Sequence, residues 1–237
     1  MTGWLARRRR RRVRARPIPP AWLEILTRTA PFVGRLEPAR RAKLLGDVAV
    51  LVAEKTFIGA GGQVIDDEVK VTIAAAAARL VLYLDVDRYD ALTEIVVHPS
   101  AYQHPEGDAV ILGEAHSWGV VVLAWDAVRA GLLDPRDGHD TAVHEFAHVL
   151  DRADGSFDGA PALRARGDYG PWAAVMQRHF ERLRADDPEV ARVLRDYGAT
   201  NEAEFFAVAT EAYFEKPAAL ERRAPALFAV LDRFYRG

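Results

Sequence analysis

The spacing of apolar residues predicts a chain that is mostly helical, with a few strands near its middle. Apolar residues recur at helical intervals in the segments 21–30, 38–55 and 66–84, the last of which is capped by Asp66 or Asp67. The alanine-rich part of the third segment is interrupted by Arg79 and is too short to span a bilayer, so a buried helix is expected. The chain contains no other stretch that predicts a transmembrane segment.

Three short segments rich in β-branched residues, 94–97, 109–112 and 120–125, predict strands. From residue 137 onward the pattern is helical almost to the end. Together these segments predict an α+β fold with a small sheet before a helical region. The segment 120–125 is a candidate edge strand that could pair with an extended peptide, although a run that is apolar on both faces equally suits an internal strand.

The pentapeptide HEFAH, which contains His144, Glu145 and His148, lies in a segment predicted to be a buried helix. Residues four apart on a helix project to the same side, so the two imidazoles could bind one zinc ion, with Glu145 beside them as a base. Histidines at this spacing can also be ordinary packing residues. However, burying two histidines and a glutamate without partners is costly, and a cation would compensate. The pattern therefore predicts a metal site.

A catalytic zinc site needs a third protein ligand, and the sequence offers three candidates. Asp154 lies ten residues after His144, but the motif with that spacing requires a glycine where this chain has Asp151. Glu204 lies in the first turn of a helix predicted between Asn201 and Pro217, where it could instead complete a capping box with Asn201. Glu211 lies on the same face as Glu204, as a ligand or as an acceptor that orients a histidine, and spacing alone does not separate the two. The remaining histidines lack ligand spacing to one another and are assigned no metal role: His98, His104, His116, His139 and His179.

Two separated motifs, HEFAHVLD and, about fifty residues later, YGATNEAEFFAVATEAYF, resemble the Mlc titration factor A family of bacterial zinc peptidases. The second motif also resembles the protease domain of anthrax lethal factor. The resemblance covers residues 139 to about 235, and SWGVVVLAWD resembles the family's segment before the metal helix.

This resemblance implies a zincin-like metallopeptidase with Zn²⁺ held by His144, His148 and Glu204, a gluzincin-like ligand set. It implies that Glu145 is the general base and that Tyr197 stabilises the oxyanion and helps to protonate the leaving amine. The expected activity is hydrolysis of a peptide or protein substrate, with aminopeptidase action in some members. In one branch the family associates with the glucose repressor Mlc, so the alternative function is binding of a transcription repressor, with the zinc site secondary.

Composition is that of an ordinary soluble chain: of 237 residues, 50% are hydrophobic and 28% are charged. This length predicts one domain over residues 21–237. The absence of cysteine excludes disulfides and thiolate metal ligands, and it is compatible with the expected cytoplasmic location.

Charge is distributed unevenly. Eight arginines lie between Arg7 and Arg16, and the rest of the chain has 24 basic residues against 34 acidic ones. Residues 1–20 are therefore predicted to be a basic, disordered tail that could bind nucleic acid or an anionic membrane surface. The acidic body argues against nucleic acid as a partner. The prolines at 17, 19 and 20 exclude a secretory signal in this segment.

Overall fold

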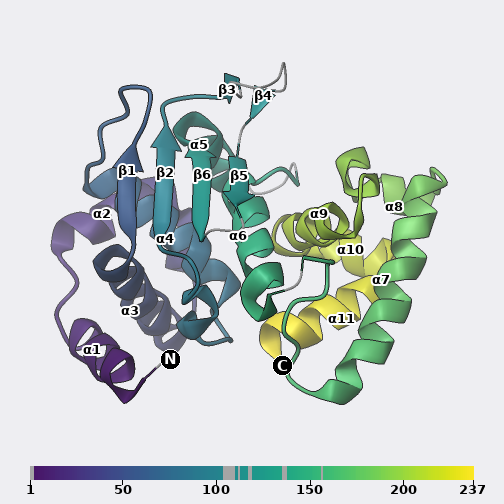
Figure 1. Ribbon diagram of the computed structural model, residues 1–237, viewed down its shortest axis with the longest axis horizontal. Coiled ribbons are helices and arrows are strands. Elements are labelled where there is room, and N and C mark those ends of the chain that lie inside the picture. Colours follow the sequence, from purple (N-terminus) through teal and green to yellow (C-terminus); the bar gives the residue numbers. More distant parts are fainter. Residues whose placement is uncertain (1–2, 104–109, 112, 117–118, 135–137, 156) are drawn as a thin grey trace. The chain divides into compact units, whose positions relative to one another are not determined.

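The computed structural model describes residues 3–103, 110–111, 113–116, 119–134, 138–155 and 157–237, with residues 102, 103, 110, 111, 114–116 and 154 described by their backbone alone (Figure 1). The chain forms two compact units, Met1–Leu133 and Asp134–Gly237. The predicted α+β class, mostly helical with a small sheet, is confirmed. The proposed single domain over residues 21–237 stays a prediction.

The first unit combines a helical layer with the sheet. Its helices are α1 (Trp4–Arg14), α2 (Pro20–Thr29), α3 (Pro38–Glu54), α4 (Asp67–Leu80) and α5 (Trp125–Leu133), with short 3₁₀ turns η1 (Pro31–Arg35) and η2 (Val86–Tyr89). The predicted buried helix is α4, capped by the Asp66 carboxylate, which accepts the Val69 N–H at 2.9 Å. Its alanines are inaccessible to solvent, so α2 and α3 can pack closely against it. In the described part of the chain, no helix has the length and apolarity needed to cross a membrane.

The main sheet has the strand order β1 (Thr56–Gly59), β2 (Glu94–His98), β6 (Val120–Ala124) and β5 (Gly113–His116). The β1–β2 and β2–β6 pairs are parallel, and β5 is antiparallel to β6. A separate antiparallel pair joins β3 (Tyr102–Gln103) to β4 (Val110–Ile111). The register places Ile95 beside Val121 and Val97 beside Leu123, four buried side chains.

Two of the predicted strands, 94–97 and 120–125, correspond to β2 and β6, and the third overlaps β4, with Ala109 and Leu112 outside the described residues. The candidate edge strand was wrong: β6 lies between β2 and β5, so its backbone is paired on both sides. Four consecutive buried residues, 121–124, agree with this internal position. The pattern did not predict β1 or β5, because β1 is short with little buried surface and β5 carries few β-branched residues.

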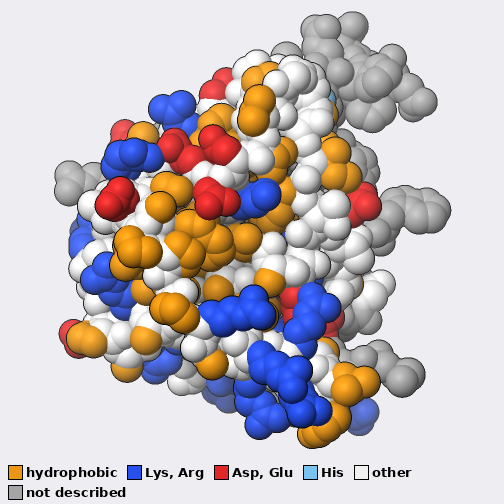
Figure 2. Space-filling model, turned by 90° about the vertical axis from the view of Figure 1, so that its left-hand side faces the viewer, with side chains coloured by type: hydrophobic (Ala, Val, Ile, Leu, Met, Phe, Trp, Pro, Cys, Tyr) orange, Lys and Arg blue, Asp and Glu red, His pale blue; other side chains and the backbone are white. Residues whose placement is uncertain are grey.

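The segment expected to be a disordered tail instead contains helix α1. Arginine favours helix formation, and Arg10 is buried in an ion-pair cluster with Glu54 (2.6 Å), Asp90 (2.7 Å) and Asp87. Arg14 pairs with the fully buried Asp47 at 2.6 Å. Figure 2 shows the resulting concentration of Lys and Arg side chains low on this face of the molecule. The carboxylates that order the helix come from distant parts of the chain.

Every regular element described in the second unit is a helix. It contains α6 (Thr141–Asp151), α7 (Tyr169–Arg184), α8 (Pro188–Ala191), α9 (Glu202–Glu215), α10 (Pro217–Arg223) and α11 (Pro225–Arg236), with 3₁₀ turns η3 (Arg152–Asp154), η4 (Arg166–Asp168) and η5 (Asp196–Ala199). Helix α9 is buried on almost every side and packs against α6, α7, α10 and α11. Trp172, Phe206 and Phe234 form edge-to-face contacts at its core, with ring centroids 5.7–6.2 Å apart. The position of α9 fixes the geometry of the site described next.

Candidate metal centre

Helix α6 carries both histidines of the HEFAH motif. The Asp140 carboxylate caps it by accepting the Val143 N–H at 3.0 Å, so the helix begins one turn before His144. His144, Glu145 and His148 are all buried. The predicted helix is therefore confirmed, and its geometry places the two imidazoles one turn apart on the same side.

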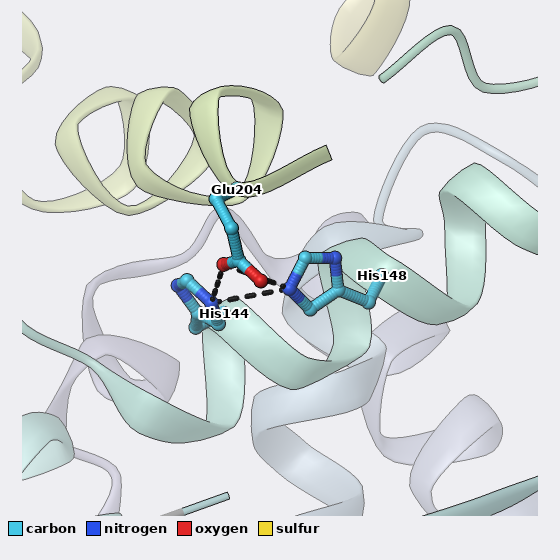
Figure 3. A group of neighbouring side chains, drawn as sticks. All are labelled: His144, His148 and Glu204. Atoms are coloured by element: carbon cyan, nitrogen blue, oxygen red, sulfur yellow. Dashed lines mark hydrogen bonds and ion pairs between the residues drawn. The ribbon is translucent and has the colours of Figure 1, made fainter. Parts of the chain in front are cut away.

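Helix α9 packs across α6 and brings Glu204 to the two histidines (Figure 3). The Glu204 Oε2 atom lies 2.9 Å from His144 Nε2 and 3.3 Å from His148 Nε2, and the two Nε2 atoms are 3.1 Å apart. In a tetrahedral zinc site with bonds of about 2.1 Å, neighbouring donor atoms are about 3.4 Å apart. The three donor atoms therefore already have nearly the mutual spacing that a small tetrahedral cation requires.

Glu211, the other candidate on α9, binds the far side of His144. Its Oε1 atom accepts a hydrogen bond from His144 Nδ1 at 2.7 Å, and its Oε2 atom accepts the Asp140 N–H at 2.9 Å. A proton on Nδ1 leaves the lone pair of His144 Nε2 free to face Glu204 and His148. Glu211 thus has the place of an orienting carboxylate, and Glu204 has the place of a ligand.

Arg195 completes the surroundings of Glu211. Its guanidinium donates to Glu211 Oε1, so the fully buried carboxylate has a cation as well as two hydrogen-bond donors. Sequence reasoning missed Arg195. Nothing in its spacing connects it to Glu211, sixteen residues later, because the contact forms only when η5 packs against α9.

The electrostatics of the group favour positive charge at its centre. Burial opposes a charged His144, but hydrogen bonds to Glu204 and Glu211 outweigh it and raise the pKa of His144 to about 10. Burial lowers the pKa of His148. Burial alone would raise the pKa of Glu204, yet its hydrogen bonds with the two histidines lower that pKa well below the usual range. The carboxylates of Glu204 and Glu211 therefore favour a positive charge on the histidines. A metal ion bound there would compete with the proton for the same nitrogen lone pairs.

The surroundings of His148 differ from those of His144. Among the described residues no group hydrogen-bonds to its Nδ1 atom. Its ring lies 5.2 Å from the ring of Phe157, and the Arg152 guanidinium lies 3.9 Å over that same phenyl ring. Since Phe157 is 44% exposed, an apolar surface borders this side of the metal group.

Tyr197 lies on the other side, in η5. Its ring centroid is 5.8 Å from that of His144, and half of its surface is exposed. Gly198 lets η5 pack tightly, since a Cβ atom there would lie 3.2 Å from both Leu183 and Val208. Partial burial, followed by the nearby charges of Glu204 and Glu145, raises the pKa of the Tyr197 phenol. The phenol therefore keeps its proton at neutral pH and can donate a hydrogen bond.

Of the other residues considered from the sequence, those that the structure describes lie outside the group. The side chain of Asp154 lies outside the described residues, as do His104 and the side chain of His116. His179 is buried on α7, where its Nδ1 donates to the Val175 carbonyl at 2.8 Å. His98 lies at the end of β2 and His139 is exposed. Among the described residues, His144, His148 and Glu204 form the one cluster suited to a metal ion.

Comparisons with known proteins agree with this site. The sequence profile of the family described as "Glucose-regulated metallo-peptidase M90" matches residues 4–236. An uncharacterized protein of Synechocystis sp. is 38% identical over 235 residues, covering 93% of this chain and 85% of that protein. Mlc titration factor A of Yersinia pestis and that of Yersinia pseudotuberculosis are each 27% identical over 231 residues, covering 91% of this chain and 83% of theirs.

Proposed function

The chain belongs to the glucose-regulated metallo-peptidase M90 family, and from that premise we propose that it hydrolyses peptide bonds at a zinc ion held by His144, His148 and Glu204. The observation that carries the proposal is the convergence of three donor atoms from two helices within 4.8 Å of one another. Two imidazoles and one carboxylate are a ligand set that zinc takes in peptidases. When bound, zinc would polarise the scissile carbonyl and acidify a water molecule.

The chain's own residues supply the proton transfers. Glu145 lies beside His144 in the buried part of α6, and its charge acts on both His144 and Tyr197. We assign it as the base that accepts a proton from the attacking water and then delivers that proton to the departing nitrogen. Tyr197, protonated at neutral pH, would donate a hydrogen bond to the carbonyl oxygen as negative charge develops there.

Metal content by elemental analysis is the primary test. The wild-type protein should contain about one zinc per chain. Glu204→Ala should lose it, whereas Asp154→Ala should retain it and Glu145→Gln should retain it without peptidase activity. If the wild-type chain contains no metal and takes up none in a zinc titration, the proposal is wrong.

The mode of cleavage needs its own assay, because family membership does not separate aminopeptidases from endopeptidases. Amino-acid anilides with a free amine should be compared with internally quenched peptides whose amine is blocked. We expect hydrolysis of the anilides if the free amine is recognised. Cleavage of blocked peptides alone would instead assign an endopeptidase.

The names of the Yersinia relatives favour a second candidate function, binding of a transcription repressor. Glu145→Gln separates the two, because it removes the base and preserves the ligands. A regulatory effect that survives this change would assign the function to binding. If the effect disappears with peptide cleavage while the fold and metal persist, the function is catalytic.

A further inference from the structure

Helix α1 is held rigidly against the first unit by its inner face. Arg10 is 5% exposed and pairs with three carboxylates, and Arg14 lies against Gly46 of α3 while it pairs with Asp47. A Cβ atom on Gly46 would lie 3.1 Å from Arg14 Cγ, so the glycine makes room for the arginine. The opposite face of α1 is therefore presented to solvent in a fixed orientation.

That outer face has an unusual combination of charge and apolar surface. Trp4, Arg8, Arg11 and Arg12 are spaced at helical intervals of three and four, so they lie on the same side of α1. The three arginines have no ion pair to a described carboxylate, and the Arg8 guanidinium lies 5.3 Å from the Trp4 ring. Trp4 and Leu5 are 64% and 71% exposed. Unpaired guanidinium groups thus surround a solvated tryptophan and leucine.

From this face we infer that α1 binds an anionic lipid surface. Arginine side chains bind lipid phosphates in the headgroup region, and tryptophan and leucine enter the boundary with the acyl chains. Basic residues combined with Trp and Leu are the composition of helices that bind at a membrane surface, and here the two apolar side chains lie exposed at the start of α1 beside the arginines. The rigid attachment through Arg10 means that this face needs no folding on binding.

A nucleic acid is a weaker match for the same face. The hollow beside α1, about 380 Å³, borders the face at Trp4 and Arg11 and also contains two carboxylates, which would repel a phosphate backbone entering it; its lining residues are Trp4, Arg7, Arg10, Arg11, Arg14, Asp85 and Asp87. An exposed leucine contributes nothing to phosphate or base recognition. Helix α1 itself carries no carboxylate, so a flat lipid surface that lies on the helix outside this hollow meets no acidic side chain of α1.

Vesicle sedimentation with the full chain tests the inference. The protein should sediment with vesicles of phosphatidylcholine mixed with phosphatidylglycerol, but not with pure phosphatidylcholine, and added salt should weaken this binding. Each arginine near an anionic surface contributes about fivefold to partitioning, so R8A/R11A/R12A should weaken it about 100-fold. No binding to phosphatidylglycerol vesicles would overturn the inference.

The matched control is R35A/R129A/R178A, which removes three exposed arginines elsewhere and changes the net charge equally. It should change partitioning by less than about threefold, since none of these three arginines lies on α1. An equal loss in both triple variants would reduce the effect to overall charge and contradict the assigned face.

Tryptophan fluorescence supplies a second measurement. Of the five tryptophans, Trp4 alone should move into the lipid boundary, so a blue shift with anionic vesicles should disappear in Trp4→Phe. W4A/L5A should also weaken partitioning by about tenfold with the arginines intact. Salt-dependent binding to DNA without vesicle binding would assign the face to nucleic acid and contradict the inference.

Discussion

At the scale of single residues, two carboxylates on one helix contact different atoms of the histidine pair and its surroundings. Glu204 faces both Nε2 atoms, and Glu211 holds Nδ1 of His144 and the first backbone N–H of the α6 cap. The chemistry of the side chain is the same in both cases. Under the proposed function, position on the helix would decide which carboxylate binds the metal ion and which one orients a histidine ligand.

Glu211→Gln tests this division of tasks. The amide keeps the size of the carboxylate but loses its charge, and its NH₂ group must face a donor, either the Asp140 N–H or Arg195. Zinc affinity, measured by competition with a chromophoric chelator, should fall by about 10–100-fold without disappearing. Glu189→Gln, an exposed change in α8, is the control. Complete loss of metal in Glu211→Gln with retention in Glu204→Gln would reverse the assignment.

Tyr197→Phe should lower kcat by about 100-fold with KM changed by less than about threefold, because the hydroxyl would act on charge that develops in the transition state. Metal content should be unchanged. Tyr169→Phe is the matched control, since it removes a phenol that accepts only the Leu163 N–H in the same unit. A Tyr197→Phe protein with wild-type kcat would exclude the tyrosine from catalysis.

Local pattern predicted the histidine pair but not its surroundings. His144, Glu145 and His148 share one helix, so their relative positions follow from helical geometry alone. The choice between Glu204 and Glu211 depends on how α9 crosses α6, a contact between segments about sixty residues apart. Arg195 escaped prediction for the same reason, because ion pairs between elements leave no periodic trace in a sequence.

At the scale of elements, helices that contain a long periodic pattern of apolar residues could be predicted. Several of them begin directly after a capping residue, as at Asp66, Asp140 and Asn201. Helix α1 was not predicted, because the carboxylates that order it lie 33 to 80 residues away from their arginines along the chain. Strand order was also beyond local pattern. Strand β6 is internal because β2 and β5 pair with its two edges, and such pairing depends on the whole sheet rather than on the sequence of one strand.

Lys55, at the end of α3, gives the first unit a pH dependence. Burial lowers its pKa to about 8 despite the neighbouring Glu54, and its Nζ donates to the Tyr89 and Leu92 carbonyls. Between pH 8 and about 10.4 the unfolded chain holds a proton that the folded chain has lost, so this group's contribution to stability increases with pH. Below pH 8 the cost of burying the charge is present in full.

The comparison of wild type with Lys55→Met should reveal this dependence. Free energies of unfolding are measured in urea at about pH 7 and about pH 10. The free energy of unfolding of the wild type, relative to that of Lys55→Met, should be higher at about pH 10 than at about pH 7. The expected shift is on the order of 1 kcal/mol. If the relative stability of the wild type stays the same between the two pH values, or falls at the higher one, Lys55 does not carry a buried ammonium group with a lowered pKa.

At the scale of the whole molecule, a bound ion should add to thermal stability, because it would connect α6 and α9 at the centre of the second unit. A ligand present at 1,000 times its Kd stabilises the folded state by about 4 kcal/mol, which corresponds to about 10 °C in Tm for a chain of this length. Calorimetry before and after chelation should show this decrease. Glu204→Gln should show no response to the chelator, and a wild-type Tm insensitive to zinc would mean that the site does not bind it.

The packing of Gly198 has a consequence for how this protein can change over generations. Gly198, next to Tyr197, packs closely against Leu183 and Val208, so we expect substitutions at the two adjacent positions to have different effects. A change at 197 replaces the phenol, whereas a side chain at 198 would press on Leu183 and Val208 and require the turn or these neighbours to shift by a few tenths of an ångström. In a library randomised at both positions and selected for activity, the second codon should therefore return to glycine even among survivors that have exchanged the tyrosine.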